Sequence, residues 1–415
     1  MNASRRQFLK TSLATGSLVS LGITVPAFLT RTALAAPLAD KKGAKDTILV
    51  VVQLTGGNDG LNTVVPFADP EYAKLRPTLK LPTNQLKKVN DQIGLHPSLE
   101  GFAKLLQDQV LCIVQGVGYP NPDQSHFRSM DIWQAGSNGA TLNEGWLGRA
   151  LKQLPTPPAF HVAGPNEVSP LALAGAPMRV PSISSLEDFQ LRTSSAGSGL
   201  EKKEQRALME GAARPKAGQS PGLLDFVQRT AVNTYASSQR LQEIGKNYQP
   251  KAPYPNAPLA NHLKLAAQLI DADLGARIFY VSIDNFDTHA NQLNTHANLL
   301  RQLSDSITAF YQDMSARGHK DRILMMTFSE FGRRPYENGS QGTDHGAAAP
   351  MFLVGGKVKA GAVGKHPSLT DHSFGNLKHS MDFRQVYAAI LDKWLGVKSK
   401  EVLGQEFEPA GIWKT

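Results

Sequence analysis

The chain has 415 residues, of which 44 are Lys or Arg and 35 are Asp or Glu, so its formal net charge is +9. A hydrophobic fraction of 41% with 36 glycines and 26 prolines is ordinary for a globular protein rich in loops, which excludes a disordered or collagen-like chain. The single cysteine, Cys112, excludes an intramolecular disulfide and a zinc cluster built from cysteines. The length predicts two to three domains, or one large domain with insertions.

The first 35 residues have the pattern of an export signal. Arg5 and Arg6 precede an apolar stretch over residues 13–29, and Ala33-Leu34-Ala35 then offers a small-x-small cleavage site. Paired arginines ahead of such a stretch indicate the twin-arginine route. We therefore expect the twin-arginine translocase as a partner during export, and a mature protein that reaches the periplasm or the medium already folded.

The charge of the mature chain is mild. Residues 1–35 carry four cations and no acid, so their removal lowers the net charge from +9 to +5. That excess is too small to indicate binding to nucleic acid or to a membrane surface. No second apolar run of 18 or more residues follows, so we expect no membrane span after cleavage.

Strand and helix patterns alternate along the mature chain. Short apolar runs predict buried strands at 47–54, 109–115, 277–283, 322–328 and 350–354. The apolar residues of 300–314 recur at spacings of three and four, which predicts a helix, and 263–270 and 386–394 have the same pattern. The alternation predicts an α/β fold with a parallel sheet covered on both faces.

The middle of the chain has a different composition. Residues 154–258 are rich in Pro, Ala, Ser and Gly, with one cluster of charged residues near position 203. We interpret 154–258 as a helical insertion or cap with flexible joints, within a single α/β domain that covers 36–415. Within it, Gly218-Gln219-Ser220-Pro221-Gly222 matches the nucleophile-elbow pattern, but Pro221 lacks the backbone N–H that the oxyanion hole needs.

Polar residues lie next to the ends of four of the predicted strands. They are Asp59, then Asp284, Asp287 and His289, then Glu330 and Arg333, and finally Asp344 and His345 ahead of the fifth strand. Strand ends of an α/β sheet meet at one edge, and carboxylates with imidazoles suit Zn, Mn or Mg. Each residue also has a purely structural explanation, such as an Asx-turn at Asp59, a helix cap at Asp287 or an ion pair between Glu330 and an arginine.

Ser125 and His126 follow the second strand at an expected helix start. The N-terminus of a helix favours an alkoxide or a bound phosphate, so Ser125 is a candidate nucleophile and equally a plain N-cap. His126 is a candidate base, a metal ligand or a packed ring. Neither a dinucleotide-binding fingerprint nor a phosphate-binding loop is present, so a nucleotide cofactor has no support.

Together these motifs resemble the DUF1501 family, whose members are twin-arginine-exported proteins of the alkaline phosphatase-like and sulfatase-like superfamily. The resemblance is carried by LTGGNDGLNTVVP (54–66), SHFRSMDIWQ (125–134), FDTHANQ (286–292), SEFGRRP (329–335), GTDHGAAAPMFLVGG (342–356) and DFRQVYAAILDKWLG (382–396). These segments extend over residues 47–396. The resemblance implies a three-layer α/β/α sandwich with a mostly parallel central sheet.

The resemblance also implies a site with one or two divalent metals. Asp59 matches the first metal-binding Asp, Ser125 the nucleophile, and Asp287 (or Asp284) with His289 the later Asp/His pair. His345 is similar to the last histidine of phosphopentomutase-like members. Arg333 would clamp the developing oxyanion, and Asp344 belongs to the same segment as His345.

One position departs from the superfamily pattern. Where relatives have Asp-His-Gly, the chain has Glu330-Phe331-Gly332, so a phenylalanine replaces an imidazole. An alternative alignment gives that role to Asp344-His345-Gly346, about 15 residues beyond the strand. The sequence around Ser125 also lacks the motif that formylglycine formation requires, which disfavours sulfatase chemistry of that kind.

Two functions remain open from the sequence. The first is an exported metal-dependent hydrolase or transferase that acts on a phosphate- or sulfate-type ester of a small molecule or a polymer, with Zn or Mn as the metal. The second is a non-catalytic protein on the same fold that binds a partner or polymer of the cell envelope, for which Phe331 is the main support.

Overall fold

The computed structural model describes residues 47–139, 142–154, 159–165, 167–186, 245, 247–273 and 275–414. The expected export signal at 1–35 lies outside them. The chain divides into two units, and the larger one comprises Lys45–Ile183, Gln249–Ala267 and Ala276–Thr415. The description below concerns this larger unit. None of the helices in the described residues is long and apolar enough to cross a membrane.

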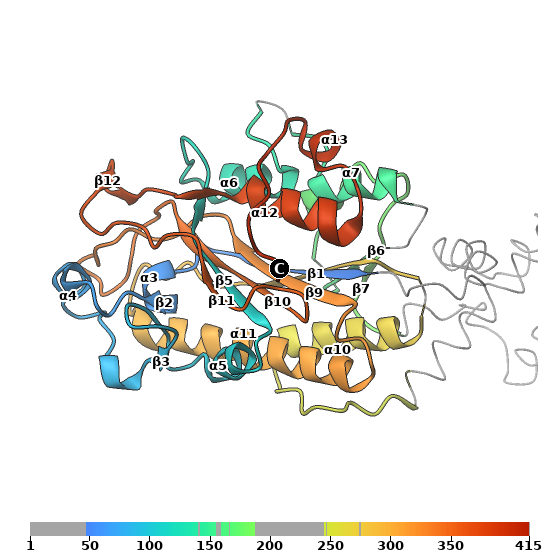
Figure 1. Ribbon diagram of the computed structural model, residues 1–415, viewed down its shortest axis with the longest axis horizontal. Coiled ribbons are helices and arrows are strands. Elements are labelled where there is room, and N and C mark those ends of the chain that lie inside the picture. Colours follow the sequence, from blue (N-terminus) through green and yellow to red (C-terminus); the bar gives the residue numbers. More distant parts are fainter. Residues whose placement is uncertain are drawn as a thin grey trace, which may run out of the picture. The chain divides into compact units, whose positions relative to one another are not determined.

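A sheet of nine strands forms the centre of the unit (Figure 1). The strand order is β11-β5-β10-β9-β1-β8-β6-β7, and β14 also pairs with β5. The strands are β1 (Ile48–Leu54), β5 (Leu111–Gly118), β6 (Ala159–Val162), β7 (Ser182–Ile183), β8 (Ile278–Ile283), β9 (Ile323–Ser329), β10 (Ala349–Gly355), β11 (Gly361–Val363) and β14 (Met381–Asp382). All five predicted strands belong to this sheet.

One strand runs against the others. β1 pairs in parallel with β8 and β9, whereas β10 is antiparallel to both β9 and β5. The sheet is therefore mostly parallel, as predicted, but the fifth predicted strand is reversed. The reason is local, because β9 and β10 are consecutive along the chain and neighbours in the sheet, with no crossover helix between them. The start of β10 consequently lies at the same edge as the ends of β9 and β1.

Helices cover both faces of the sheet and complete the three layers (Figure 1). One layer holds α5 (Glu100–Gln107), α10 (Pro258–Asp271) and α11 (Gln292–Ala316), and the other holds α6 (His126–Ala135), α7 (Trp146–Gln153), α12 (Phe383–Ile390) and α13 (Ser399–Leu403). The predicted apolar stripe of residues 300–314 is fully buried within α11. The predicted three-layer α/β architecture is confirmed.

Shorter elements lie at the edge of the sheet at which the parallel strands end. They are α3 (Gly60–Thr63), α4 (Pro70–Leu75), β2 (Val64–Val65), β3 (Lys87–Lys88), β4 (Gly94–Leu95), β12 (His372–Ser373) and β13 (Asn376–Leu377). The remaining turns are η2 (Thr83–Gln85), η3 (Leu171–Leu173) and η5 (Leu391–Leu395).

Strand β1 explains why the core lies around the middle of the sheet. It has neighbours on both sides, and its apolar residues are buried on both faces, from Leu49 to Val52 without alternation. A continuous β-branched run is what a central strand covered by helices on both faces requires. The loop that follows β1 is thereby fixed at the middle of the sheet edge at which the parallel strands end, which we call the functional edge.

The predicted insertion at 154–258 overlaps the sheet. Its first part forms β6, which pairs with β8, and β7, which pairs with β6. Strands of four and two residues are too short to show an alternating pattern, so the sequence pattern did not predict them. Residues 187–244 lie outside the described residues, and a helical insertion there stays a prediction.

Candidate metal centre

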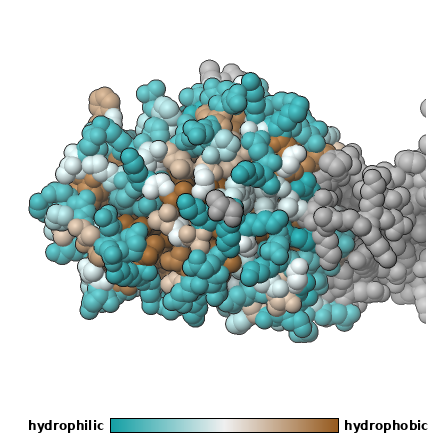
Figure 2. Space-filling view, in the orientation of Figure 1, coloured by the Kyte–Doolittle hydropathy of each residue, from teal (hydrophilic) through white to brown (hydrophobic). Residues whose placement is uncertain are grey.

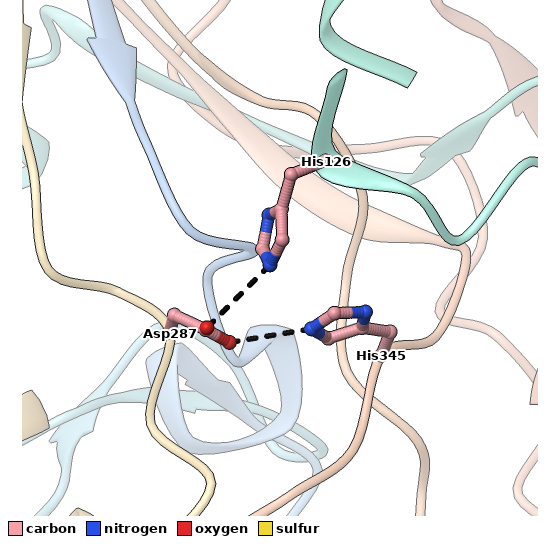
Figure 3. Close-up of side chains that lie close together, drawn as sticks. All are labelled: His126, Asp287 and His345. Carbon is pink, nitrogen blue, oxygen red and sulfur yellow. Dashed lines mark hydrogen bonds and ion pairs between the residues drawn. The ribbon is translucent and has the colours of Figure 1, made fainter. Parts of the chain in front are cut away.

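The carboxyl ends of β1, β8 and β9 meet the start of α6 at one edge of the sheet, and the candidate site lies there. Three side chains from different segments converge on this point, namely His126, Asp287 and His345 (Figure 3). One nitrogen or oxygen atom from each lies within 4.8 Å of the other two. His126 Nε2 is 3.5 Å from Asp287 Oδ2, and His345 Nε2 is 3.3 Å from Asp287 Oδ1.

The connection between β9 and β10 returns to the site through a small hairpin. Gly332 and Gly346 exchange backbone hydrogen bonds with the opposite arm, and Arg333 forms a β-bridge with His345. This fold-back brings His345 beside the end of β9, although it lies 16 residues beyond Ser329 in the sequence. The Glu330 segment and the Asp344-His345-Gly346 segment, which competed as alternatives in the sequence, are thus both at the site.

In two histidines, a hydrogen bond at Nδ1 determines that the other ring nitrogen, Nε2, faces the site. His126 Nδ1 is 2.8 Å from the Glu330 carboxylate, and His345 Nδ1 is 2.8 Å from the backbone carbonyl of Gln124. Carboxylate and carbonyl oxygens only accept hydrogen bonds, so Nδ1 carries the proton in both rings. Each neutral ring then presents the lone pair of Nε2 to the centre, which is the arrangement that carboxylate–histidine–metal sites use.

A third histidine has the same arrangement. His289 Nδ1 lies 3.3 Å from Asp344 Oδ1, and Asn338 donates to that same oxygen over 3.1 Å. His289 Nε2 lies 3.0 Å from Asp287 Oδ1 and 3.0 Å from His345 Nε2. With the proton on Nδ1, the Nε2 lone pair of His289 therefore faces both the carboxylate and the other imidazole.

These distances test whether the residues suit a metal ion. Lone pairs that face one another at 3.0–3.5 Å repel unless a cation lies among them. A tetrahedral zinc with bonds of about 2.0 Å separates its ligands by about 3.3 Å, close to the 3.5 and 3.3 Å between Asp287 and the two histidines His126 and His345. In addition, Nε2 of His126 is buried and makes no hydrogen bond among the described residues. The donor set is of a kind that can hold a divalent cation.

The protonation behaviour of the two facing histidines differs. The hydrogen bond that His126 donates to Glu330 raises the pKa of His126, whereas burial lowers the pKa of His345. Burial by itself would raise the pKa of Asp287, but the hydrogen bond and charge of Arg333, together with His289, lower it. Asp287 is therefore ionised at neutral pH and available as a ligand.

Two residues predicted as metal ligands, Glu330 and Asp344, contact histidines of the cluster. Glu330 is fully buried, and besides His126 its carboxylate accepts hydrogen bonds from the Gly56 N–H over 2.8 Å and from the Ser329 hydroxyl over 3.0 Å. Asp344 is bound to His289 and Asn338. Both carboxylates contact the outer nitrogen of a histidine, so they orient the imidazoles.

Arg333, predicted to clamp an oxyanion, is buried with its donors already in use. Its guanidinium donates to the carbonyl oxygens of Gly57 and Thr343 over 2.7 and 2.8 Å, and to Asp287 Oδ1 over 2.5 Å. The side chain has no exposed surface. The guanidinium of Arg333 therefore binds Asp287 and is not exposed to solvent.

Phe331, at the position where the resemblance implied an imidazole, forms part of the inner wall of the site. Its ring lies 4.9 Å from that of His126 and 4.8 Å from that of His345, measured between centroids. It is 1% exposed. An apolar ring thus supports the two histidines and contributes no ligand atom.

Asp59 lies in a separate buried network. Its carboxylate pairs with the Arg76 guanidinium, whose Nη2 donates to Oδ1 over 2.9 Å, and accepts a hydrogen bond from the Gln292 side chain. Burial alone would raise the pKa of Asp59, yet the charge and hydrogen bond of Arg76 lower it. The structure does not bring Asp59 into the group formed by His126, Asp287 and His345.

Ser125 is exposed at the N-cap of α6, and its hydroxyl makes no capping hydrogen bond. It precedes His126, so its backbone borders the centre. Asp284, the alternative to Asp287, is exposed just after β8. A role for Ser125 as nucleophile stays a prediction.

Sequence reasoning missed two residues that support the site. Gln124 binds His345 through its main-chain carbonyl, which no side-chain pattern reveals. Asn338 holds Asp344 and also donates to the carbonyl of His289 over 2.9 Å. Its position within a long connection offered no signal before the hairpin was known.

A family model described as "Protein of unknown function (DUF1501)" matches residues 46–405. The chain belongs to the DUF1501 family. No functionally curated protein matches the sequence of this DUF1501 protein.

Three solved structures illustrate what the DUF1501 chain is similar to in shape. An alkaline phosphatase from the Antarctic bacterium TAB5 has 11% identity and a TM-score of 0.30, with 75% of this chain and 92% of that chain covered. The PsFucS1 sulfatase from Pseudoalteromonas sp. has 12% identity and a TM-score of 0.37, with 94% and 78% covered.

The third is a protein of the alkaline phosphatase superfamily from Vibrio parahaemolyticus, with 8% identity, a TM-score of 0.39, and 92% and 78% covered. Similarity at this level concerns the fold alone. The chemistry of the DUF1501 protein has to be inferred from its own residues.

Proposed function

We propose that this DUF1501 protein holds one divalent cation and cleaves or transfers a phosphate- or sulfate-type ester. His126, Asp287 and His345 would hold the ion, with His289 beside them, and zinc or manganese suits these donors. The observation that carries the proposal is the convergence of three Nε2 lone pairs on one carboxylate, with each Nδ1 tied to an acceptor.

One ion per chain is proposed, although the sequence left one or two open. The Asp59 carboxylate is neutralised by Arg76, and the position of a further imidazole is taken by Phe331. Among the described residues, His126, Asp287 and His345 form the one group of three ligating side chains close enough to share an ion, so a second cation near Asp59 or Phe331 would need further ligands.

The residues around the ion would perform distinct tasks. A bound divalent cation supplies a Lewis acid that polarises an ester oxygen or lowers the pKa of water. Asp287, His289 and Asp344 are each between 44% and 49% exposed at their side chains, so a substrate would approach from their side. Glu330 and the Gln124 carbonyl would keep His126 and His345 in the required tautomer. Ser125, exposed next to His126, is the candidate nucleophile.

We further propose that the protein acts outside the cytoplasm, after export in the folded state. The support is the twin-arginine pattern of residues 1–35. The substrate stays open between a small molecule and a polymer.

The second candidate function, binding without catalysis, has one specific observation in its favour. Arg333 already gives Asp287 a buried positive partner at 2.5 Å, so the carboxylate has a counter-ion even without a metal. In that case the cluster would serve only to shape a binding surface on the cell envelope.

Metal content decides between the two. We would measure zinc and manganese by plasma mass spectrometry in full-length protein purified without chelator, and in the variants His126→Ala, His345→Ala and His379→Ala. The proposal expects about one ion per chain in the parent protein and in His379→Ala, a half-buried histidine outside the cluster, and a loss in the other two. A parent protein free of metal, even after zinc is added, would favour the binding function.

If metal is present, Ser125→Ala tests the chemistry. The proposal expects the variant to keep its metal and lose turnover of aryl phosphate and aryl sulfate esters. Full turnover in Ser125→Ala would remove the serine from the mechanism, and a metal-loaded parent protein without turnover of any ester would leave only a binding role.

A further inference from the structure

Arg333 joins the two segments that supply Asp287 and His345, and it also contacts the loop after β1. Its Nε donates to Gly57 O in the loop after β1, its Nη1 to Thr343 O in the β9–β10 connection, and its Nη2 to Phe286 O after β8 over 3.2 Å. Nη2 also donates to the carbonyl of Gly56 and to Asp287 Oδ1. The strand ends that surround the site therefore share one guanidinium.

The geometry points to Arg333 as the positioning residue that sets the orientation of Asp287 for the metal, an inference that rests on the proposed function. A hydrogen bond to Oδ1 at 2.5 Å fixes the rotation of a carboxylate that is itself 45% exposed and otherwise free to turn toward solvent. Oδ2 is then directed at His126 Nε2, 3.5 Å away. The planar fork holds this angle because its other donors are anchored on carbonyl oxygens.

The main chain of Arg333 strengthens the same link. Arg333 forms an antiparallel bridge with His345, so the residue that orients Asp287 also sets the position of a ligand histidine. Its Nη1 lies 3.4 Å from His289 Nε2 as well. One residue thereby couples the positions of the two ligand side chains Asp287 and His345 and also borders the imidazole of His289.

Arg333 could affect metal binding through its charge or through the orientation of Asp287. The two roles predict different changes in metal affinity, so an experiment can distinguish them. A nearby guanidinium repels a divalent cation, so a role through charge alone would make Arg333→Met bind metal more tightly and leave Arg333→Lys unchanged. A role through orientation predicts that both variants bind more weakly, because neither methionine nor lysine reproduces the fork. Loss of an outer partner of a metal ligand costs about 10- to 100-fold in metal affinity.

The experiment measures Zn²⁺ affinity by competition with a chromophoric chelator, together with the thermal midpoint of the metal-free protein. The matched control is Arg149→Met, since Arg149 likewise donates to several carbonyl oxygens, those of Ala135, Glu144 and Val402, but to none in the cluster. We expect weaker Zn²⁺ binding in both Arg333 variants and parent-like affinity in Arg149→Met. Unchanged or tighter binding in Arg333→Lys would overturn the inference.

A double-mutant cycle shows whether Arg333 acts through Asp287. In an Asp287→Asn background the Arg333→Lys substitution should cost little further affinity, because the carboxylate it orients is gone. An equal loss in both backgrounds would contradict the inference. If the parent protein binds no Zn²⁺, the proposed function is wrong, and the inference, which rests on it, is wrong as well. Should Arg333→Met not fold, Arg333→Lys and the cycle carry the test.

Discussion

The imidazole of His126 is held by a hydrogen bond to a buried carboxylate. Its Nδ1 donates to Glu330, a carboxylate with no exposed surface that also accepts the N–H of Gly56 after β1. The ring is packed against Phe331 at 4.9 Å. Tautomer and ring orientation are therefore fixed before any ligand arrives, which lowers the entropic cost of forming the site.

Glu330→Gln tests this contact at the residue scale. A neutral amide can donate to Nδ1 instead of accepting from it, which would move the proton of His126 to Nε2 and remove the lone pair from the centre. We expect Zn²⁺ affinity to fall by about 10- to 100-fold, and ¹⁵N NMR of the ring to report the changed tautomer. Glu337→Gln serves as the control, because Glu337 binds Thr78 and Leu79 in a different loop. Parent-like affinity in Glu330→Gln would show that the contact does not set the tautomer.

The element that distinguishes this site is the connection between β9 and β10. A reversed strand lets a long connection start and end at the functional edge, and the hairpin within it brings Asp344 and His345 back to Glu330. Close approach of the two arms depends on small residues. At Gly346 an added Cβ would lie 2.4 Å from the backbone carbon of Arg333, a distance that real contacts do not tolerate.

Gly346→Ala should therefore open the hairpin. We expect a loss of about 1–3 kcal/mol in the free energy of unfolding, typical of overpacking, together with weaker Zn²⁺ binding as His345 moves. Gly339→Ala in the same connection is the matched control, since a Cβ there meets nothing within 4 Å. Urea unfolding and chelator competition measure the two effects. Equal stability of the two variants would refute this account of the hairpin.

At the scale of the whole molecule, buried neutral histidines link stability to pH. Burial lowers the pKa of His96 and of His161 to about 4, and of His296 to about 3. The unfolded chain takes up these protons near pH 6.5, whereas the folded chain resists until pH 3–4. Stability should thus be complete above pH 6.5 and decline as the pH falls toward 4. The raised pKa of His126 opposes this trend only in part.

The expected magnitude makes the effect measurable. Each of the three histidines should cost about 2 kcal/mol of unfolding free energy between pH 7 and pH 5. Urea unfolding at the two pH values tests this, and His296→Gln should shrink the difference because glutamine can still donate to Asn58 without titrating. A pH difference as large in His296→Gln as in the parent protein would exclude His296 as a source.

How far the sequence predicts this protein can be judged from particular segments. The run at 47–54 predicted a central strand because burial on both faces leaves a continuous apolar pattern, and β1 has that position. The spacing in 300–314 predicted the buried face of α11. By contrast β6 and β7 went unrecognised, since strands so short leave no period, and the direction of β10 is set by its neighbours.

The residue types of the site were set by the sequence, and their roles by the tertiary structure. His126, Asp287, His289, Glu330, Arg333, Asp344 and His345 were all candidates because they follow strand ends. Which atoms face the centre depends on hydrogen bonds between segments as far apart as 126 and 330, or 124 and 345. Such contacts form only when the chain folds, and no local pattern encodes them. For the same reason the sequence predicted Asp59 as a metal ligand, whereas in the folded chain its carboxylate forms an ion pair with Arg76.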